Sequence, residues 1–242
     1  MSGKILSDRI AVVTGASRGI GYTLARELAA AGAHVVAVAR TQGALEELDD
    51  EIRAVGGSAT LVPLDLTDGE GVDRLGGALY ERFGRVDVLV GNAGVLGPIT
   101  PLSHCDPKEW DKVVAVNLSA NWRLIRSMEP LLKRSDAGRA LFVTSGVARS
   151  HRAYWGPYAV SKAALEAMVA VWAKELEITS VKANLLNPGP LRTKMRAQAM
   201  PGEDADTLER PIVLVPHVLE LLSPALEVSG RVWDYPSRSW LA

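Results

Sequence analysis

Residues 14–21 read Thr-Gly-Ala-Ser-Arg-Gly-Ile-Gly, and this stretch decides the fold that the sequence predicts. A short apolar run at residues 10–14 leads into it, and a stretch with helical spacing follows it at once. At a turn from strand to helix, Gly15 can bend the backbone sharply, Gly19 can let a pyrophosphate approach the main chain, and Gly21 can let the helix pack closely on the sheet. The free N–H groups at the start of that helix would face the phosphates. A tight turn without a ligand is the alternative, and the position directly after the first strand argues against it.

The same alternation of strand and helix continues along the chain. We predict strands at residues 10–14, 34–39, 60–64, 86–90, 140–144, 181–186 and 231–233. Between them lie stretches with an apolar residue at every third or fourth position, as at Ile20, Leu24 and Leu28. Continuous apolar strands separated by helices predict an α/β fold: a single-domain, Rossmann-like, doubly wound sheet of about seven mostly parallel strands with helices on both faces. We expect residues 1–242 to form this one domain, with the segment 188–211, rich in Pro and Gly, as a substrate loop.

Composition and charge exclude several classes of protein. The chain has 242 residues, of which 27 are basic and 28 acidic, and 48% are hydrophobic. A net charge of −1 does not favour binding to nucleic acid or to a membrane surface. No apolar run approaches the ~18 residues of a membrane span, and the N-terminus lacks the apolar region of a signal peptide. With Cys105 as its single cysteine, the chain suits a reducing compartment, and we expect a cytoplasmic protein.

The end of the second predicted strand indicates which dinucleotide is preferred. Enzymes of this architecture that use NAD usually place an acidic side chain there, on the ribose 2′-hydroxyl. Here the strand ends in Ala39 and Arg40, with no carboxylate. Arg40 and Arg18 of the glycine turn can meet a 2′-phosphate from two sides. The sequence therefore favours NADP (NADPH) over NAD, the alternative being two solvated surface arginines.

Tyr158 and Lys162 stand four residues apart in a stretch with helical spacing, so they share one helix face. A free tyrosine, with a pKa of about 10, is a poor acid or base at neutral pH, and a neighbouring ammonium would lower that pKa. Ser145 directly follows the predicted strand at residues 140–144, where the crevice of an open α/β sheet forms. A Tyr-x-x-x-Lys pair alone arises by chance on many helices. The serine at the strand end favours a proton-transfer site.

Taken in order, these motifs resemble those of the short-chain dehydrogenase/reductase family over residues 9–230. The glycine turn at residues 14–21 matches the family's Thr-Gly-x-x-x-Gly-x-Gly pattern. The family's Asn-Ala-Gly and Pro-Gly elements are matched by Asn92, Ala93, Gly94, Pro188 and Gly189. Its catalytic Asn, Ser, Tyr and Lys are matched by Asn117, Ser145, Tyr158 and Lys162. The chain looks most like a poorly characterised bacterial subgroup, which suggests no substrate.

The resemblance implies an NADP(H)-dependent oxidoreductase that interconverts a carbonyl and an alcohol by hydride transfer. Tyr158 would be the general acid or base, and Lys162 would lower its pKa and hold the nicotinamide ribose. Ser145 would orient the carbonyl, and Asn117 would hold a water in the proton relay. The implied cofactor contacts are Gly15, Ser17, Arg18, Gly19, Ile20, Gly21, Arg40, Asp65, Leu66, Asn92, Ala93, Gly94, Tyr158, Lys162, Pro188, Gly189 and Thr193. A homo-oligomer, either a dimer or a tetramer, is implied as well.

Two other functions stay open at this point. One is a cofactor-binding sensor or scaffold without turnover, which the complete set of four catalytic residues argues against. The other is an epimerase or dehydratase of the same family that uses bound NAD(P). A metal centre is not expected, since the histidines lack metal-ligand spacing; they are His34, His104, His151 and His217.

The expected pocket has an apolar wall and a basic mouth. Leu96, Val147, Trp155 and the loop at residues 190–211 would shape the wall. The basic residues are Arg149, Arg152, Arg192, Lys194 and Arg196. They can bind an anionic substrate, such as a carboxylate or a coenzyme A ester, or they form a solvated rim balanced by Glu203, Asp204 and Asp206.

The sequence departs from the family pattern at two places, and two tryptophans lie where subunit contacts are usual in the family. Gly91 stands where many members have a second asparagine. The C-terminal residues 230–240 depart from the Asp-Gly-Gly type of ending, so the usual subunit contacts cannot be assumed there. Trp122 and Trp172 lie on helices that the family usually buries between subunits, and either can equally belong to the core.

Overall fold

A computed structural model describes residues 4–241, and within this range eight strands form one sheet in the order β3-β2-β1-β4-β5-β6-β7-β8. The first seven are parallel, with registers such as Val12 opposite Val36, and β8 is antiparallel to β7. The strands are β1 (Ile10–Thr14), β2 (His34–Ala39), β3 (Ser58–Pro63), β4 (Val88–Gly91), β5 (Arg139–Val143), β6 (Lys182–Asn187), β7 (Val232–Asp234) and β8 (Ser239–Leu241).

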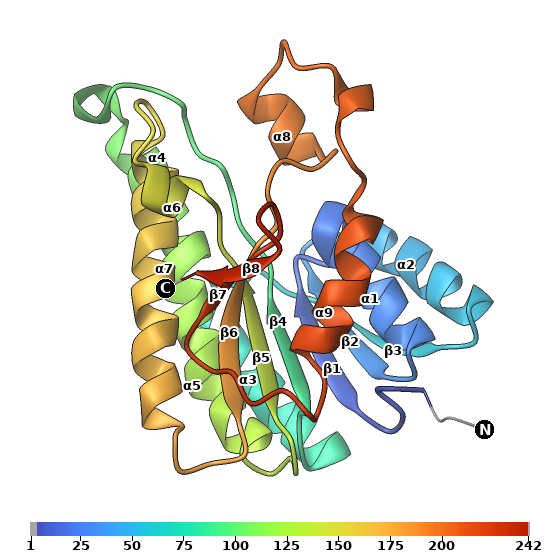
Figure 1. Ribbon diagram of the computed structural model, residues 1–242. Coiled ribbons are helices and arrows are strands. Elements are labelled where there is room, and N and C mark those ends of the chain that lie inside the picture. Colours follow the sequence, from blue (N-terminus) through green and yellow to red (C-terminus); the bar gives the residue numbers. More distant parts are fainter. Residues whose placement is uncertain (1–3, 242) are drawn as a thin grey trace.

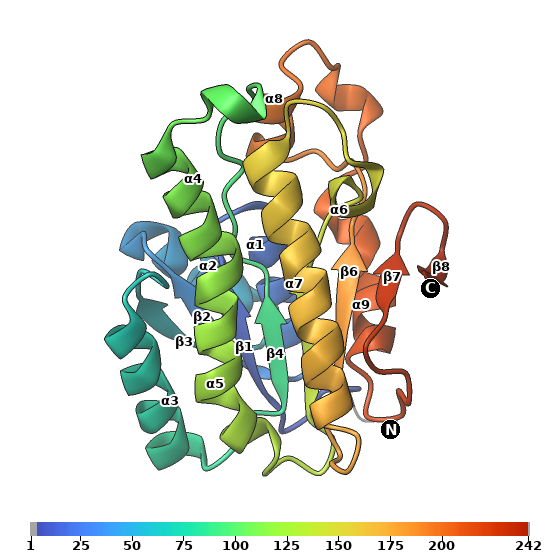
Figure 2. The same ribbon diagram turned by 90° about the vertical axis from the view of Figure 1, so that its left-hand side faces the viewer.

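Helices cover both faces of this sheet, as Figures 1 and 2 show. One layer holds α3 (Gly69–Phe83), α5 (Ala120–Leu132) and α7 (Gly156–Glu175), and the other holds α1 (Gly19–Ala30), α2 (Gln42–Ala54) and α9 (Val215–Leu221). Shorter helices lie at the carboxyl ends of the strands: α4 (Pro107–Val114), α6 (Val147–Ser150) and α8 (Lys194–Ala199). The predicted doubly wound α/β fold is therefore confirmed.

Each helical layer buries its own apolar cluster against the sheet. Val72 of α3, Leu124 of α5 and Leu165 of α7 pack with Phe142 of β5 in one cluster. Leu24, Leu28 and Leu45 pack with the opposite faces of β1 and β2 in the other. Strands buried on both faces need apolar side chains at every position, which explains the continuous apolar runs of the sequence.

Local sequence signals place the helix ends. Asp68 caps α3 by accepting a hydrogen bond of 2.9 Å from the N–H of Gly71, and Gly84 ends the same helix in the left-handed region at φ 71°. Asp106 caps α4 in the same way, and Pro107 occupies its first position. By contrast, the first turn of α1 contains no acidic residue, and Arg18 before it makes no side-chain cap to the described chain. The N-terminus of α1 is thus open toward the carboxyl ends of the strands.

The structure differs from the predicted elements in three respects. The eighth strand was not expected, because Ser239–Leu241 is too short to show a strand pattern of its own. Part of the segment 188–211 is helical, since α8 lies within it. The bounds of five predicted strands shift by one or two residues, for example from 60 to Ser58 and from 86 to Val88.

Packing explains two features that the sequence left open: the environment of Trp122 and Trp172, and the glycine at position 91. Trp172 is 2% exposed and donates a hydrogen bond of 2.7 Å to Glu129, so it belongs to the core, whereas Trp122 is 49% exposed. At Gly91, a Cβ atom would lie 2.2 Å from the ring of Phe142, which explains why this position has no side chain. In the described part of the chain, no helix has the length and apolar character needed to cross a membrane.

Candidate active site

A cleft of about 820 Å³ opens at the carboxyl ends of the strands, where the strand order reverses between β1 and β4. Such a switch point is where open α/β sheets bind their ligands. Most of the predicted site residues line the cleft: Gly15, Ser17, Arg18, Gly19, Ile20, Arg40, Asp65, Leu66, Asn92, Ala93, Gly94, Ser145, Tyr158, Lys162, Pro188, Gly189 and Thr193. Gly21 and Asn117 do not line it, but each contacts residues that do.

The glycine turn is pinned to the end of β4. The amide Nδ2 of Asn92 donates a hydrogen bond of 2.9 Å to the carbonyl oxygen of Thr14. A Cβ at Gly21 would lie 2.3 Å from that same Nδ2 and 2.4 Å from the carbonyl oxygen of Gly15. Gly15 and Gly19 have φ values of 66° and 60°, which favour glycine. The turn therefore brings the main chain and the open end of α1 to the cleft without intervening side chains, as a pyrophosphate requires.

The two arginines that the sequence singled out line the cleft where the glycine turn and the end of β2 meet it. Both Arg18 and Arg40 are exposed, and the guanidinium of Arg40 lies 3.7 Å from the carboxylate of Asp65. The N–H of Thr67 and, to a lesser degree, Arg40 lower the pKa of Asp65, against an opposing effect of burial. This end of the cleft thus fits a phosphorylated ribose, and the glycine turn fits the phosphates of the same dinucleotide.

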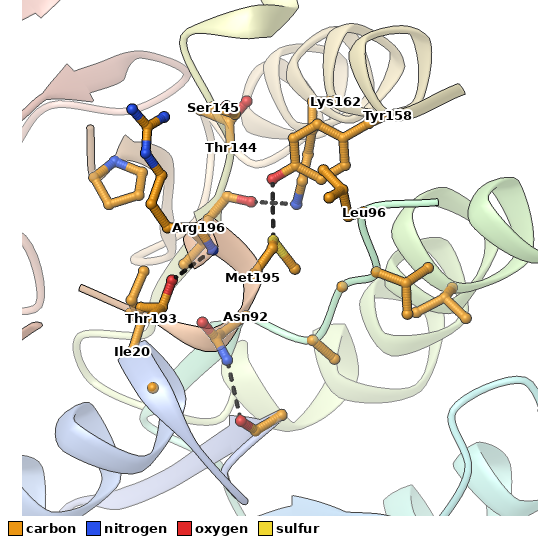
Figure 3. Close-up of a pocket in the computed structure, with 18 of the residues that line it drawn as sticks. Ile20, Asn92, Leu96, Thr144, Ser145, Tyr158, Lys162, Thr193, Met195 and Arg196 are labelled. Atoms are coloured by element: carbon orange, nitrogen blue, oxygen red, sulfur yellow. Dashed lines mark hydrogen bonds between the residues drawn. The ribbon is translucent and has the colours of Figure 1, made fainter. Parts of the chain in front are cut away.

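Tyr158 and Lys162 project from the first turns of α7 into the cleft (Figure 3). Both are buried, and the Nζ of Lys162 lies 5.8 Å from the centre of the Tyr158 ring. This Nζ donates a hydrogen bond of 2.7 Å to the carbonyl oxygen of Val143, at the end of β5. The Tyr158 hydroxyl lies 3.9 Å from the sulfur of Met195, which α8 brings across the cleft. Strand β5 therefore fixes the ammonium, while the hydroxyl of the phenol faces α8 across the cleft.

Burial dominates the acid–base properties of the pair. It raises the pKa of Tyr158 to about 12, and a hydrogen bond with Ser145 acts in the opposite direction. It also lowers the pKa of Lys162 to about 8. The tyrosine pKa thus moves opposite to the direction expected from the sequence, because loss of solvation disfavours the phenolate more than its neighbours favour it. With this pKa, the Tyr158 side chain is a neutral phenol at pH 7.

Asn117 lies in a π-helical turn at Ala115–Ser119, between α4 and α5. Its Oδ1 accepts a hydrogen bond of 2.8 Å from the N–H of Val95, and its Nδ2 donates to the carbonyl oxygen of Val95 at 2.9 Å and to the hydroxyl of Ser161 at 3.0 Å. The side chain is therefore engaged by protein groups, and the expected role of holding a water stays a prediction. It ties the segment after β4 to α7, between Tyr158 and Lys162.

Asn187, at the end of β6, is a site residue that the sequence reasoning missed. Its Oδ1 accepts hydrogen bonds from the N–H of Gly146 at 3.0 Å and of Gly189 at 3.2 Å. One amide thus joins the loop that follows Ser145 to the turn that follows Pro188. The sequence offered one signal for this role, which is the position of Asn187 directly before Pro188 and Gly189.

The remaining part of the cleft is apolar on the inside. Leu96, Trp155 and Tyr158 form a buried cluster, and the Trp155 and Tyr158 rings meet edge to face at 6.2 Å. Met195 and Val147 pack against this cluster from α8 and α6. The wall residues expected from the sequence therefore line the cleft beside the Tyr158 hydroxyl, together with part of the loop at residues 190–211.

An open helix N-terminus and a glycine turn at a switch point are typical of a dinucleotide-binding protein, and here a buried phenol lines the same cleft. The chain belongs to the short-chain dehydrogenase family, whose family model, described as short chain dehydrogenase, matches residues 9–204. It is thus an oxidoreductase of that family, and the predicted resemblance is confirmed.

Three similar proteins locate the chain within the family. The uncharacterized oxidoreductase YciK of Escherichia coli K12 is 38% identical over 221 residues, which cover 90% of this chain and 87% of YciK. A short-chain dehydrogenase of Pseudomonas syringae has a TM-score of 0.93 at 39% identity, with 96% of both chains covered. A short-chain dehydrogenase of Escherichia coli CFT073, whose crystal structure contains NADPH, has a TM-score of 0.91 at 37% identity and covers 97% of this chain and 99% of its own.

Proposed function

We propose that this protein is an NADP(H)-dependent oxidoreductase that interconverts a carbonyl and an alcohol, with Tyr158 as the general acid or base. The observation that carries the proposal is the placement of the Tyr158 phenol. It is buried beside the Lys162 ammonium, in a cleft that continues to the glycine turn and to Arg40. Carbonyl reduction requires a proton donor, a cation beside it, and a cleft that can hold a dinucleotide cofactor.

NADP(H) is the cofactor that we propose for the cleft. Arg18 and Arg40 are exposed at its ribose end, where a 2′-phosphate would meet two guanidinium groups. The complex of the similar Escherichia coli protein with NADPH supports the same choice. When bound, the nicotinamide supplies the hydride for reduction or accepts it in oxidation.

The side chains of this protein handle the proton. In reduction, the Tyr158 hydroxyl donates its proton to the carbonyl oxygen of the substrate, and the Ser145 hydroxyl orients that oxygen by hydrogen bonding. The pKa of about 12 keeps the phenol protonated for this step. In oxidation the phenolate has to form, and the Lys162 ammonium stabilises it. Asn117 acts by holding α7 against the segment that follows β4.

The test is turnover of a panel of aldehydes, ketones and alcohols with NADPH and NADP⁺, followed by the absorbance of NADPH. The variant Tyr158→Phe is expected to bind NADPH as the wild type does and to lose about 10²- to 10⁴-fold in kcat. Wild-type protein that binds NADPH but oxidises it with no member of the panel would contradict the proposal and favour a sensor. Full activity of Tyr158→Phe would remove the tyrosine from its proposed role.

We also propose that the chain acts as a single-domain, homo-oligomeric enzyme of the cytoplasm on a small molecule. Exposure of Trp122 on α5, with Val160 and Val171 on α7, supports an apolar contact between subunits. The single Cys105, without a partner for an intrachain disulfide, supports a reducing compartment.

A further inference from the structure

We propose that the substrate carries an anionic group, which Arg152 and Lys194 bind at the mouth of the cleft while its apolar body lies inside. This inference rests on the proposed function, because it concerns the substrate of the same site. It follows from the division of the cleft into an apolar inner part and a basic mouth.

The inner part accepts an apolar body. Leu96 and Trp155 are buried beside the Tyr158 ring, and Met195 and Ala199 of α8 pack against them from the other side. Polar groups that line this compartment, the hydroxyls of Ser145 and Tyr158, are committed to the carbonyl oxygen in the proposed reaction. An aliphatic or aromatic group attached to the carbonyl is therefore what this space can bury.

The mouth has an excess of positive charge. Its basic lining residues are Lys112, Arg152, Lys194 and Arg196. Within residues 4–241, Asp65 is the only carboxylate that lines the cleft, and it lies at the opposite end beside Arg40. An anion entering this end therefore meets cations and no carboxylate of the lining.

The nearby carboxylates are engaged by other groups of the protein. Glu203 forms a two-pronged ion pair with Arg196, and Asp206 pairs with Arg192 at 2.7 Å. Asp204 accepts the N–H of Asp206 and caps a short helical turn. The sequence allowed a solvated rim as the alternative. The acidic residues of that rim bind groups within it, and none of them forms an ion pair with Arg152 or Lys194. Neither of these two makes an ion pair within the part of the chain that the structure describes.

The loop between α6 and α7 holds Arg152 at the mouth. The Arg152 guanidinium lies 5.5 Å from the centre of the Trp155 ring, which belongs to the apolar compartment. His151 and Tyr154 on either side have φ values of 50° and 74°, in the left-handed region that non-glycine residues rarely adopt. The N–H of Thr100 stabilises this conformation through a hydrogen bond of 3.0 Å to the Tyr154 carbonyl oxygen. Strained backbone of this kind persists where the surrounding structure holds it, and it is typical of ligand sites.

Equilibrium binding tests the inference independently of turnover. Isothermal titration calorimetry, with NADP⁺ saturating, compares 4-carboxybenzaldehyde and 4-formylphenyl phosphate with the neutral methyl 4-formylbenzoate. Oxidised cofactor does not react with these aldehydes by hydride transfer to the carbonyl, so binding alone is measured. We expect the preferred anion to bind about tenfold more tightly than the ester, since a charge-assisted hydrogen bond contributes about that much. The tighter of the two anions identifies the group as carboxylate or phosphate.

The double variant Arg152→Ala/Lys194→Ala is expected to lose this preference to within about twofold, while Lys174→Ala, which removes an exposed lysine at the far end of α7, retains it. Raising the ionic strength should reduce the preference in the wild type. Equal affinity for ester and anions, or a preference that survives in the double variant, would overturn the inference. If no member of the wider carbonyl panel is reduced with NADPH, the proposed function fails, and the binding comparison still decides the anion site.

Discussion

Asn187 donates a hydrogen bond of 2.6 Å to the carboxylate of Asp234, and both side chains are buried. Although burial acts to raise it, hydrogen bonds from Ser237 and Asn187 hold the pKa of Asp234 below its ordinary value. Because the Oδ1 of Asn187 accepts the N–H groups of Gly146 and Gly189, the end of β7 is coupled to both loops of the candidate active site. The C-terminal strands thus support the site from behind.

The first prediction concerns the replacement of Asn187 by an aspartate. Asn187→Asp places two carboxylates in contact, and the free energy of unfolding should fall by about 2 kcal/mol at neutral pH, with a matching loss of turnover. The contact raises the pKa of the carboxylate pair above its unfolded value, so the loss should shrink as the pH falls toward about 5. Denaturant unfolding at several pH values measures both effects.

The reciprocal double variant Asn187→Asp/Asp234→Asn is the matched control. It restores one amide and one carboxylate, with an oxygen at position 187 for the two loop N–H groups, and should recover most of the lost stability and turnover. A single variant as stable and active as the wild type would show that this pair does not support the site.

The parts of the site that could be predicted are those that lie close together in the sequence. The turn at residues 14–21 and the pair of Tyr158 and Lys162 are each local patterns, and each lies where the pattern placed it. Strands such as Val88–Gly91 were recognisable because a strand buried on both faces is apolar throughout.

Contacts between distant segments could not be predicted in the same way. The bond between Asn187 and Asp234 joins residues 47 positions apart, and β8 is defined only by its pairing with β7. The direction of the Tyr158 pKa depends on how completely α7, α8 and the loop before α7 remove water from its hydroxyl, and no local pattern contains that information.

The second prediction concerns the choice of cofactor. Arg40 has a 68% exposed side chain, so Arg40→Ala should leave the fold intact and weaken NADPH binding about tenfold, with little change for NADH. Dissociation constants from cofactor fluorescence measure this for wild type, Arg40→Ala and the distant control Lys174→Ala. A wild-type preference for NADH, or equal losses for both cofactors in Arg40→Ala, would contradict a 2′-phosphate site.

A third prediction concerns the subunit contact. Helices α5 and α7 lie side by side on one face of the molecule (Figure 2), and Trp122 is 49% exposed there. If a second copy covers this face, Trp122→Glu should lower the mass measured by light scattering to that of a smaller assembly. Tyr80→Glu, at a 54% exposed aromatic of α3, is the control that should keep the wild-type mass. A wild-type monomer, or an unchanged mass for Trp122→Glu, would exclude this contact.

The last prediction follows from the burial of Lys162. Burial lowers its pKa from 10.5 to about 8, so between these values the unfolded chain binds more protons at this residue than the folded chain does. The free energy of unfolding must then rise with pH across that window, by about 3 kcal/mol for a shift of this size. Tyr158, whose pKa of about 12 exceeds its ordinary value of 10, acts in the opposite direction only above pH 10. Measurements without added cofactor from neutral pH to 10 therefore isolate the lysine.

Lys162→Met should abolish this rise. At pH 7 it should unfold with a free energy about 2 kcal/mol higher than the wild type, because removing a buried charge outweighs the loss of the hydrogen bond to Val143. Activity should be lost in the same variant, since the phenolate of Tyr158 would have no cationic neighbour. Lys174→Met, at an exposed lysine of the same helix, should retain the rise and the activity. An identical pH dependence in Lys162→Met and wild type would mean that Lys162 keeps its ordinary pKa in the folded protein.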